Sequence, residues 1–516
     1  MQEIDPRILE LREKRKQSKL GGGENRIASQ HSKGKLFARE RLDLLLDPGT
    51  FYELEPFTVQ RGDHMGGSSD EMTDGVVTGF GQINNRTVYV YAQDFTIQGG
   101  SLGEMQGKKI ARLMDLAANT GCPIIGLIDS GGARIQEGVY SLGAYAEIFK
   151  RNAIYSGVIP QISVILGPCA GGAVYSPAVT DLIIMVDKQS FMFLTGPQVI
   201  KSVTGEDVDF ESLGGAQVHL GQSGLAHLVG EDEKAALSLA RLALSYLPSN
   251  NAENPPVLPS NDDPSRAEEA LNSLVPTNPN APYSMHTAIE LIVDKGSFLE
   301  LQTTFAQNAI IGLARMDGMP VGIVSQEPSQ LAGVMDINSA DKIARFVRMC
   351  DAFNIPVITF VDSPGFLPGV NQEHNGVIRH GAKVLFAYAE STVPKISITT
   401  RKSYGGAYVV LSSKFIGTDI TLAWPSAEIA VMGPDGAANI LYGKQIKNAD
   451  DPNAERERLT EEYRQTFLNP YAAAKAGYVD DVIEPRETRQ RIILGLHALR
   501  DKAVSLPARK HGNIPL

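Results

Sequence analysis

Two short glycine-rich segments are places where the backbone itself could do chemistry. GPCAGGAVYSPAVTD spans 167–181, and SYGGAYVVLSS spans 403–413. In each, an apolar run passes through a Gly-Gly pair into residues that can start a helix. Free N–H groups converge at such a junction and favour negative charge, and glycine leaves room for a ligand. The pattern predicts an oxyanion site in which each donor contributes roughly 3 kcal/mol to the rate, although either segment alone is also compatible with a tight turn that binds nothing.

A second pair of segments follows apolar runs and carries glycines and polar residues. DSGGARIQEG occupies 129–138, and DSPGFLPGVNQEHNGVIRHG occupies 362–381. Ligands bind at the carboxyl ends of strands in open α/β sheets, which is where these segments are expected. One oxyanion site in each half of the chain implies that two carbonyl groups are polarised.

Other catalytic patterns have weaker support. GGSLG at 99–103 fits the loose nucleophile-elbow pattern, but no strong apolar strand leads into it and no convincing His-acid set accompanies it. GEMQGKK has no glycine five residues before Gly107, so it is not a phosphate-binding P-loop. His64, His219 and His227 are isolated in the sequence, and a structural role is favoured for His380. Glu104 and Glu137 lie near the glycine segments, but the sequence alone does not reveal a pairing of their carboxylates. No cluster of metal ligands is recognisable.

The chain contains a long internal repeat. Residues 109–132, KIARLMDLAANTGCPIIGLIDSGG, align without a gap with 342–365, KIARFVRMCDAFNIPVITFVDSPG, at an offset of 233. Residues 157–173 match 391–407 at an offset of 234. Identical KIAR, Asp-Ser and GGA elements at a nearly constant offset indicate duplication and divergence.

The repeat predicts the elements that position the glycine segments. It extends back to Gln93 and Gln326, each of which follows an apolar run. A helix follows in each copy, and Ser339 is the expected N-cap of the second. The apolar stripes of these helices are Ile110, Leu113, Met114 and Ala117, and Ile343, Phe346, Val347, Cys350 and Phe353. PIIGLID and PVITFVD suit strands buried on both faces, so we expect βα units and a parallel sheet in each copy.

The length of 516 residues also favours two domains. We predict an α/β protein with domains at 1–258 and 268–508, related by internal duplication. The Pro- and Asn-rich segment 249–283 is the expected linker. The charged N-terminal extension should form a helix at roughly 6–19, which either packs on another subunit or domain or is solvated.

Composition restricts the class of protein. The net charge of −11 disfavours nucleic acid as a partner. No apolar run reaches about 18 residues, so no membrane segment is expected. The charged start resembles no secretory signal, which favours a cytoplasmic location. The widely spaced Cys122, Cys169 and Cys350 support neither a zinc ribbon nor a disulfide framework.

The motifs together resemble the carboxyltransferase (β) subunits of propionyl-CoA carboxylases, and equally the matching subunits of methylmalonyl-CoA decarboxylases and transcarboxylase. The similar segments are DSGGARIQEG, GPCAGGAVYSPA, TGPQVIKSVTGEDV, DSPGFLPG, IRHGAK, RKSYGGAY, AWPSAEIAVMG and KHGNIPL. The resemblance runs from about residue 20 to the end. It implies two tandem crotonase-like (ClpP/crotonase) domains. It also implies a homohexamer in which each active site lies between the N domain of one chain and the C domain of another.

The resemblance also implies how the work is divided. The N-terminal domain, 1–258, would bind acyl-CoA, and the C-terminal domain, 268–508, would bind carboxybiotin. Thioester oxyanion donors are expected at Gly171 and Gly172, supported by Gly131, Gly132 and Ala133. Biotin ureido donors are expected at Gly406 and Ala407, with Gly365, Phe366 and Gly405 nearby. Carboxybiotin would release CO2, its ureido anion would take the α proton, and the enolate would attack CO2, so no catalytic His or Glu is required.

Missing motifs define the expected partners. The sequence has neither an ATP-binding glycine loop nor a biotin-attachment segment of the AMKM kind. Biotin should therefore be carried on another chain, and the biotin carboxylase and biotin carboxyl carrier subunits are the expected partners, with no metal required. The CxxC ribbon of the bacterial acetyl-CoA type is missing too. The resemblance favours propionyl-CoA as the acceptor. Val409 departs from it, because some propionyl-preferring members have Asp at this acyl-pocket position, and an aliphatic residue there also suits methylmalonyl- or acetyl-handling relatives, so acetyl-CoA stays possible.

Three alternatives stay open. The chain could be the α subunit of a methylmalonyl-CoA decarboxylase, which runs the transfer in reverse. It could be a biotin-independent crotonase-type hydratase or hydrolase, although such enzymes need only one GGA site. A non-catalytic scaffold subunit is the third, and the intact glycines at both sites argue against it.

Overall fold

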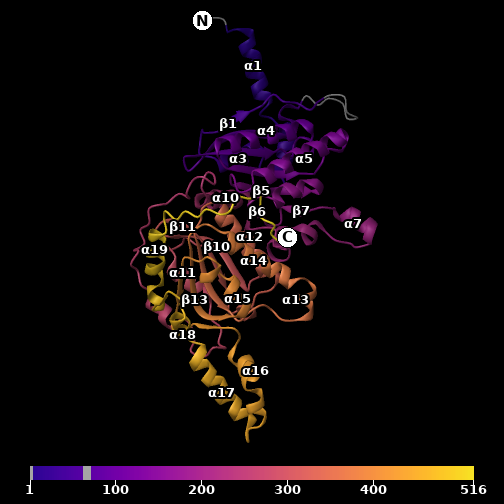
Figure 1. Cartoon of the computed structure of the whole chain (residues 1–516). Helices are drawn as coiled ribbons and strands as arrows, with labels where there is room; N and C mark the ends of the chain where they lie inside the picture. Colours follow the sequence, from indigo (N-terminus) through magenta and orange to yellow (C-terminus); the bar gives the residue numbers. More distant parts are fainter. Residues whose placement is uncertain (1–3, 62–70, 516) are drawn as a thin grey trace. The chain divides into compact units, whose positions relative to one another are not determined.

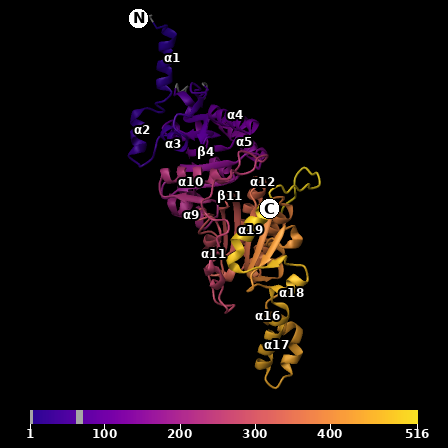
Figure 2. The same ribbon diagram turned by 90° about the vertical axis from the view of Figure 1, so that its left-hand side faces the viewer.

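Two eight-stranded sheets organise the described residues, 4–61 and 71–515, of the computed structural model (Figures 1 and 2). The chain divides into two units, Met1–Glu253 and Asn254–Leu516, each with its own sheet. The division falls inside the predicted linker, 249–283. That segment contains a short 3₁₀ helix, Glu269–Ser273, and otherwise no helix or strand.

The sheet of the first unit has the strand order β1-β2-β3-β4-β5-β6-β8, with β7 paired to β5. Its strands are β1 (Tyr52–Leu54), β2 (Val76–Ile83), β3 (Arg86–Gln93), β4 (Ile124–Ser130), β5 (Gln161–Ala170), β6 (Leu182–Val186), β7 (Phe191–Phe193) and β8 (Leu228–Gly230). The pairs from β3 to β6 and β8 are parallel, as predicted. The β1–β2 and β2–β3 pairs are antiparallel, which the sequence analysis did not predict.

The sheet of the second unit repeats this order strand for strand, as β9-β10-β11-β12-β13-β14-β16 with β15 paired to β13. Its strands are β9 (Leu299–Leu301), β10 (Ala309–Met316), β11 (Met319–Gln326), β12 (Val357–Ser363), β13 (Lys395–Tyr404), β14 (Ile420–Ala423), β15 (Glu428–Ala430) and β16 (Asp481–Val482). Even the irregularity near the end of β4 recurs at the end of β12. The predicted duplication is confirmed.

Figure 1 shows helices beside the sheet of each unit and others that project away from it. In the first unit they are α1 (Pro6–Gln17), α2 (Glu24–His31), α3 (Ala38–Leu45), α4 (Glu104–Thr120), α5 (Val139–Ile154), α6 (Tyr175–Ala178), α7 (Pro197–Thr204), α8 (Phe210–Gly214), α9 (Ala216–Gly221) and α10 (Glu233–Tyr246). In the second they are α11 (Met285–Ile292), α12 (Ile337–Ala352), α13 (Val370–His374), α14 (Val377–Glu390), α15 (Gly405–Val410), α16 (Pro434–Lys447), α17 (Pro452–Phe467), α18 (Pro470–Lys475) and α19 (Thr488–Ala498). α16 and α17 form a hairpin that extends from the second sheet (Figures 1 and 2). No helix within 4–61 or 71–515 is both long and apolar enough to cross a bilayer.

The repeated KIAR segment lies in α4 and α12, and its predicted apolar stripes are buried in both helices. The repeated lysines are buried as well. The Nζ of Lys109 donates to the backbone oxygen of Val76 at 2.7 Å, and the Nζ of Lys342 donates to that of Phe305 at 2.7 Å. Each lysine therefore ties its helix to the chain that leads into the sheet, which explains why it recurs.

The predicted N-cap of α12 was wrong. Asp336, not Ser339, caps the helix, and its Oδ1 accepts the Ser339 N–H at 2.9 Å. The Ser339 hydroxyl accepts the Asp336 N–H in return at 2.8 Å. The two residues form a reciprocal capping box, in which Asp336 is a favoured N-cap and the Ser339 hydroxyl takes the place of the usual Glu or Gln at the third helical position.

Candidate active site

The first GGA turn, residues 171–173, follows directly from β5. Gly171 has a φ of +61°, in the left-handed region where only glycine is comfortable. Gly172 has no such requirement: a Cβ built on it would lie 3.8 Å from the Tyr145 ring, at ordinary contact distance. The fold thus demands glycine at the first position of the turn but not at the second.

The second GGA turn, residues 405–407, follows β13 with the same geometry. Gly405 has a φ of +56°, and a Cβ on Gly406 would lie 3.6 Å from the Phe366 ring. Gly406 is exposed, whereas Ala407 is fully buried. The helix that follows the first turn, α6, has four residues, and the helix that begins with the second turn, α15, has six. Their dipoles are therefore small, and the N–H groups of the turn itself must provide any stabilisation of an anion.

The first strand-end loop, residues 131–133, is held by a parallel bridge between Ala133 and Leu102. The Leu102 N–H donates to the Gly132 oxygen at 2.8 Å, and the Arg134 N–H donates to the Leu102 oxygen at 3.0 Å. These bonds use the groups on either side of Ala133, so the N–H of Ala133 points away from Leu102.

The second loop, residues 364–366, repeats this bridge between Phe366 and Met335. The Met335 N–H donates to the Gly365 oxygen at 3.0 Å, and the Leu367 N–H donates to the Met335 oxygen at 2.7 Å. The N–H of Phe366 therefore points away from Met335, just as the N–H of Ala133 points away from Leu102. Each unit therefore presents one loop N–H in addition to its GGA turn.

Loop and turn meet in each unit. In the first, a Cβ on Gly132 would lie 2.8 Å from the Ala170 oxygen, at the start of the GGA turn. Gly131 is tied down by a bond from its N–H to the Gly99 oxygen at 3.0 Å. In the second, the Phe366 ring lies against the positions where Gly406 and Gly381 would carry side chains.

All the predicted site residues except Val409 thus lie in the loops and turns of their own units. Val409 is 46% exposed on α15, the helix that begins with the second GGA turn.

The carboxylates near the first loop are committed to structure. Glu137 is buried and accepts from the Arg134 guanidinium at 2.7 Å, and the same guanidinium donates to Asp74 at 2.6 Å. The other oxygen of Glu137 accepts the Glu104 N–H at 2.6 Å. Burial raises the pKa of Asp74 despite the adjacent guanidinium. Glu137 therefore braces the loop and is not placed as a free base.

The histidines have structural roles as well. His219 and His227 hydrogen-bond to main-chain groups of neighbouring strands, and His380 pairs with Asp341 at 2.8 Å. His64 lies outside the described residues. Within the part of the chain that the structure describes, no group of three or more His, Cys, Asp or Glu side chains is arranged to hold a metal ion. What each site offers is therefore a set of oriented backbone N–H groups.

The sequence analysis did not assign a role to the residues that fix the ends of β4 and β12. The Gln93 side-chain oxygen accepts the Asp129 N–H at 3.3 Å, and that of Gln326 accepts the Asp362 N–H at 3.2 Å. Both the glutamines and the aspartates recur at the offset of 233. That recurrence was the signal that could have identified them.

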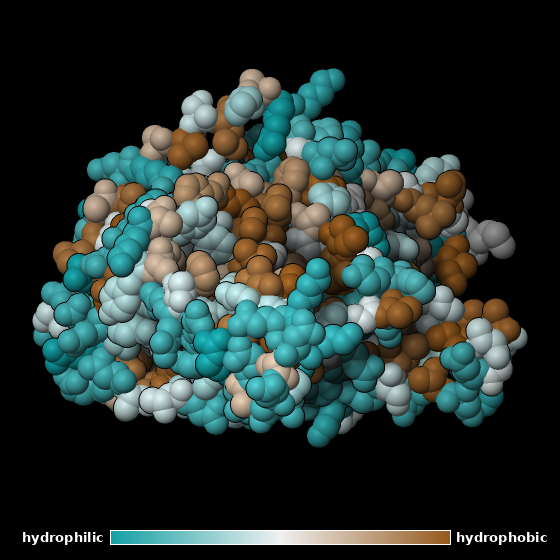
Figure 3. Space-filling view, turned by 60° about the horizontal axis from the view of Figure 1, so that its bottom comes forward, coloured by the Kyte–Doolittle hydropathy of each residue, from teal (hydrophilic) through white to brown (hydrophobic). Residues whose placement is uncertain are grey.

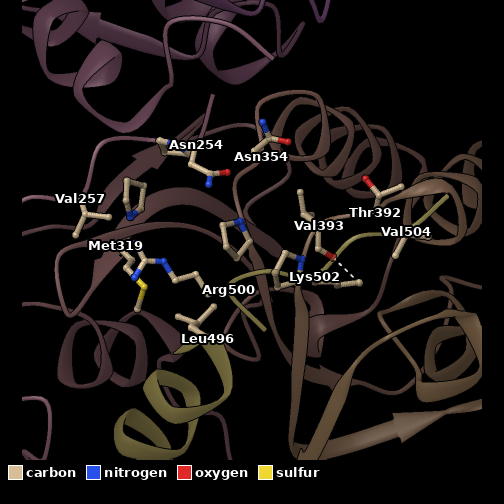
Figure 4. A pocket seen from close by; sticks show the side chains of 14 residues that line it. Asn254, Val257, Met319, Asn354, Thr392, Val393, Leu496, Arg500, Lys502 and Val504 are labelled. Atoms are coloured by element: carbon tan, nitrogen blue, oxygen red, sulfur yellow. Dashed lines mark hydrogen bonds between the residues drawn. The ribbon is translucent and has the colours of Figure 1, made fainter. Parts of the chain in front are cut away.

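A pocket in the second unit is separate from these loops and turns (Figure 4). Pro320, Pro356 and Pro394 line it, and they stand at the amino ends of β11, β12 and β13. Figure 4 shows Lys502 beside Val393 in the pocket lining, where the Lys502 Nζ donates to the Val393 backbone oxygen at 3.0 Å. The GGA turns and loops follow the carboxyl ends of the strands, so this pocket belongs to the opposite edge of the sheet.

Comparison with known proteins identifies the family. The carboxyl transferase domain model matches residues 29–514. The chain is 56% identical to a propionyl-CoA carboxylase carboxyltransferase subunit of Haloferax mediterranei, over 99% of this chain and 100% of that protein. It is 54% identical to the methylmalonyl-CoA decarboxylase subunit alpha of Propionigenium modestum, over 99% of both chains.

A crystal structure supports the same assignment at the level of the fold. It is the transcarboxylase 12S hexamer assembly with methylmalonyl-coenzyme A and methylmalonic acid bound. That structure matches with a TM-score of 0.97 at 49% identity, over 100% of this chain and 99% of that one. The predicted fold of two tandem crotonase-like domains is confirmed. The chain belongs to the carboxyl transferase domain family and is a carboxyltransferase of the propionyl-CoA carboxylase type.

Proposed function

We propose that this chain transfers a carboxyl group from carboxybiotin to the α carbon of a short acyl-CoA. Propionyl-CoA is the favoured acceptor, which makes methylmalonyl-CoA the product. The observation that carries this proposal is the pair of equivalent GGA turns, each accompanied by a strand-end loop with an N–H that points away from its bridge partner. One chain with two such sites suits a reaction in which two carbonyl oxygens gain negative charge.

The two units have different roles in the proposal. The N-terminal domain, 1–258, binds acyl-CoA, and the C-terminal domain, 268–508, binds the carboxylated biotin. The thioester oxygen is held by Gly171 and Gly172, with Gly131, Gly132 and Ala133 shaping the site. The ureido oxygen is held by Gly406 and Ala407, with Gly365, Phe366 and Gly405 beside it.

The residues of the second site fit a biotin head group. Gly406 is exposed and carries no side chain, so a planar ring can approach the backbone there. The Phe366 ring lies beside that position and offers an apolar face. Carboxylated biotin supplies both the carboxyl group and the base that removes the α proton. This chain's backbone N–H groups then have one task in each site, which is to stabilise the oxygen that becomes negative.

Biotin itself belongs to a partner in this proposal. A biotin carboxyl carrier subunit brings it, and a biotin carboxylase subunit charges it with ATP, in the cytoplasm. We further propose that the chain forms a homohexamer in which the first unit of one copy and the second unit of another complete each site. The described surface carries large exposed apolar side chains on and beside α15 and α16: Val409, Val431, Ile440 and Leu441. Hydrophobic residues gather in patches on the face shown in Figure 3, and such patches mark contact surfaces between proteins.

A second candidate function is that of the α subunit of a methylmalonyl-CoA decarboxylase. The 54% identity to such a subunit favours it. The same site would run the transfer in reverse, from methylmalonyl-CoA to biotin. Affinity purification from the native cell distinguishes the two. Co-purification of a biotin carboxylase supports the carboxylase, and co-purification of a membrane-embedded decarboxylase subunit supports the decarboxylase.

The proposal is tested with the purified chain, a carboxylated biotin carrier, and acetyl-, propionyl- or butyryl-CoA. We expect acyl-dependent transfer with the highest kcat/KM for propionyl-CoA. No transfer to any of the three would refute the carboxyltransferase proposal. Hydration of an enoyl-CoA without biotin would instead support a crotonase-type hydratase. Val409 should affect the preference among acyl groups, so Val409→Asp should change the ratio of kcat/KM values, and a streptavidin blot should find no biotin on this chain.

A further inference from the structure

The strand that leads into each loop ends in a buried carboxylate, Asp129 in β4 and Asp362 in β12. The main chain around each is fixed closely. A Cβ on Gly100 would lie 2.1 Å from the main-chain oxygen of Asp129, and one on Gly333 would lie 2.3 Å from the main-chain oxygen of Asp362. Each carboxylate is thus carried by a closely fixed strand end, four residues before the bridged loop residue Ala133 or Phe366.

In the first unit the compensating charges come from the segment before and within α3. The Lys35 ammonium contacts Asp129 at 2.6 Å, and the Arg41 guanidinium contacts it at 2.9 Å. Arg41 also pairs with the buried Glu233 at 2.7 Å. These four buried side chains have no net charge in total. Gly167 makes room for the cluster, because a Cβ there would lie 2.6 Å from the Lys35 Nζ.

In the second unit the compensating charge comes from the sheet itself. The Arg401 guanidinium contacts Asp362 at 3.0 Å, and the other oxygen of Asp362 accepts the Lys402 N–H at 3.0 Å. Arg401 occupies the position in β13 that Gly167 occupies in β5, at the repeat offset of 234. The duplication thus preserved the carboxylate and its neutralisation, although the cation comes from two different places in the sequence.

This conservation of charge has a physical reason. An uncompensated buried carboxylate beside an oxyanion would repel the charge that develops there, and removing one partner of a buried pair is costly to the local structure. We propose that Lys35 and Arg41 in the first unit, and Arg401 in the second, are equivalent positioning residues. They hold and neutralise the strand-end carboxylate, so that the loop keeps its geometry and its field favours an anion.

One consequence is that residues 35–41, which precede the repeat, are part of the first site. The inference rests on the proposed function for the identity of the oxygen that each site serves. The geometry of the two clusters is independent of that assignment, and so is one of the two tests.

The kinetic test compares substitutions that remove or keep the charge. Lys35→Met and Arg401→Met should each lower kcat of carboxyl transfer about tenfold or more, the effect of one uncompensated charge at low effective dielectric. Lys35→Arg and Arg401→Lys should recover most of that loss. Arg489→Met is the matched control, because Arg489 is equally buried and pairs with the buried Asp294 at 2.7 Å. It should weaken the fold without lowering kcat per folded molecule.

Hydrogen–deuterium exchange gives a readout that does not depend on activity. Lys35→Met should speed exchange at residues 131–134, and Arg401→Met at 364–367, each without affecting the other loop. Full activity and unchanged exchange in Lys35→Met would overturn the inference. So would a loss of activity that Lys35→Arg fails to restore, or an equal loss in Arg489→Met. If the unaltered chain transferred no carboxyl group, the proposed function would fall while the exchange experiment still decided the positioning role.

Discussion

A single methyl group added at Gly172 should lower turnover by about 10²-fold to 10³-fold without weakening the fold. The backbone of Gly172 lies outside the left-handed region, and a Cβ there would meet the Tyr145 ring at 3.8 Å, an ordinary contact. Replacing glycine by alanine in a compatible conformation stabilises a protein by about 0.4–1 kcal/mol, because the unfolded chain loses freedom. Gly172→Ala should therefore unfold at an unchanged or slightly higher urea concentration.

Its neighbour in the turn should behave in the opposite way. Gly171 has a φ of +61°, where an L residue costs roughly 1–2 kcal/mol. Gly171→Ala should therefore lower the free energy of unfolding by about that amount. The same contrast should hold in the second turn between Gly406, whose Cβ would lie 3.6 Å from the Phe366 ring, and Gly405, with a φ of +56°.

The catalytic effect of Gly172→Ala follows from the proposed site. A methyl group beside the donor N–H would displace the thioester oxygen, and loss of one such donor costs about 10²-fold to 10³-fold in kcat. Urea unfolding and steady-state transfer kinetics on the same preparations measure both quantities. If Gly172→Ala kept full turnover, or if it lost stability in proportion to activity, the reasoning that glycine is required there for ligand access would be wrong.

Three further predictions concern the second unit. Hydrogen bonds with Glu300 and then Glu327 raise the pKa of His286 to about 10, above its ordinary value of 6.5. The contribution of His286 to stability is therefore complete below about pH 6.5 and is lost as the pH rises toward 10. The free energy of unfolding of His286→Gln, measured with urea, should depend less on pH across that window than that of the unaltered chain. An unchanged pH dependence would contradict this. Lys342→Met should lower the free energy of unfolding by about 3 kcal/mol, because the ammonium donates to three backbone oxygens within 3.0 Å, and unchanged urea unfolding would count against that role. Phe366→Ala should raise KM for the carboxylated carrier and leave KM for acyl-CoA unchanged, whereas the reverse pattern would exclude Phe366 from the biotin side.

Much of the fold could be predicted because the duplication doubles every signal. The buried strands β4 and β12 and the apolar stripes of α4 and α12 are local patterns that occur twice in register. The antiparallel β2–β3 and β10–β11 pairs were missed, although Asn84-Asn85 and Asp317-Gly318, with positive φ, are hairpin signals. In these cases the information was present in the sequence and was not used.

The charge clusters are different in kind. Nothing in the local pattern connects Lys35 or Arg41 with Asp129, about ninety residues later, and neither cation has a counterpart in the second copy. Only the packed structure brings them together, with Gly167 leaving the space. Contacts of this kind depend on tertiary packing and not on periodicity, so they could not be predicted from the chain alone.

In the proposed enzyme, the first unit of one chain and the second unit of another contribute the two halves of each active site. The most direct measurement is the rate of carboxyl transfer by Gly172→Val, by Gly406→Val, and by hybrid oligomers made by co-expressing the two. Each variant alone should be inactive. Hybrids should recover about one quarter of the unaltered activity, because about that fraction of sites would combine an intact first unit with an intact second unit from another copy. If either variant alone kept about half of the activity, the two turns would be independent sites, and the proposal of an active site shared between two units would be wrong.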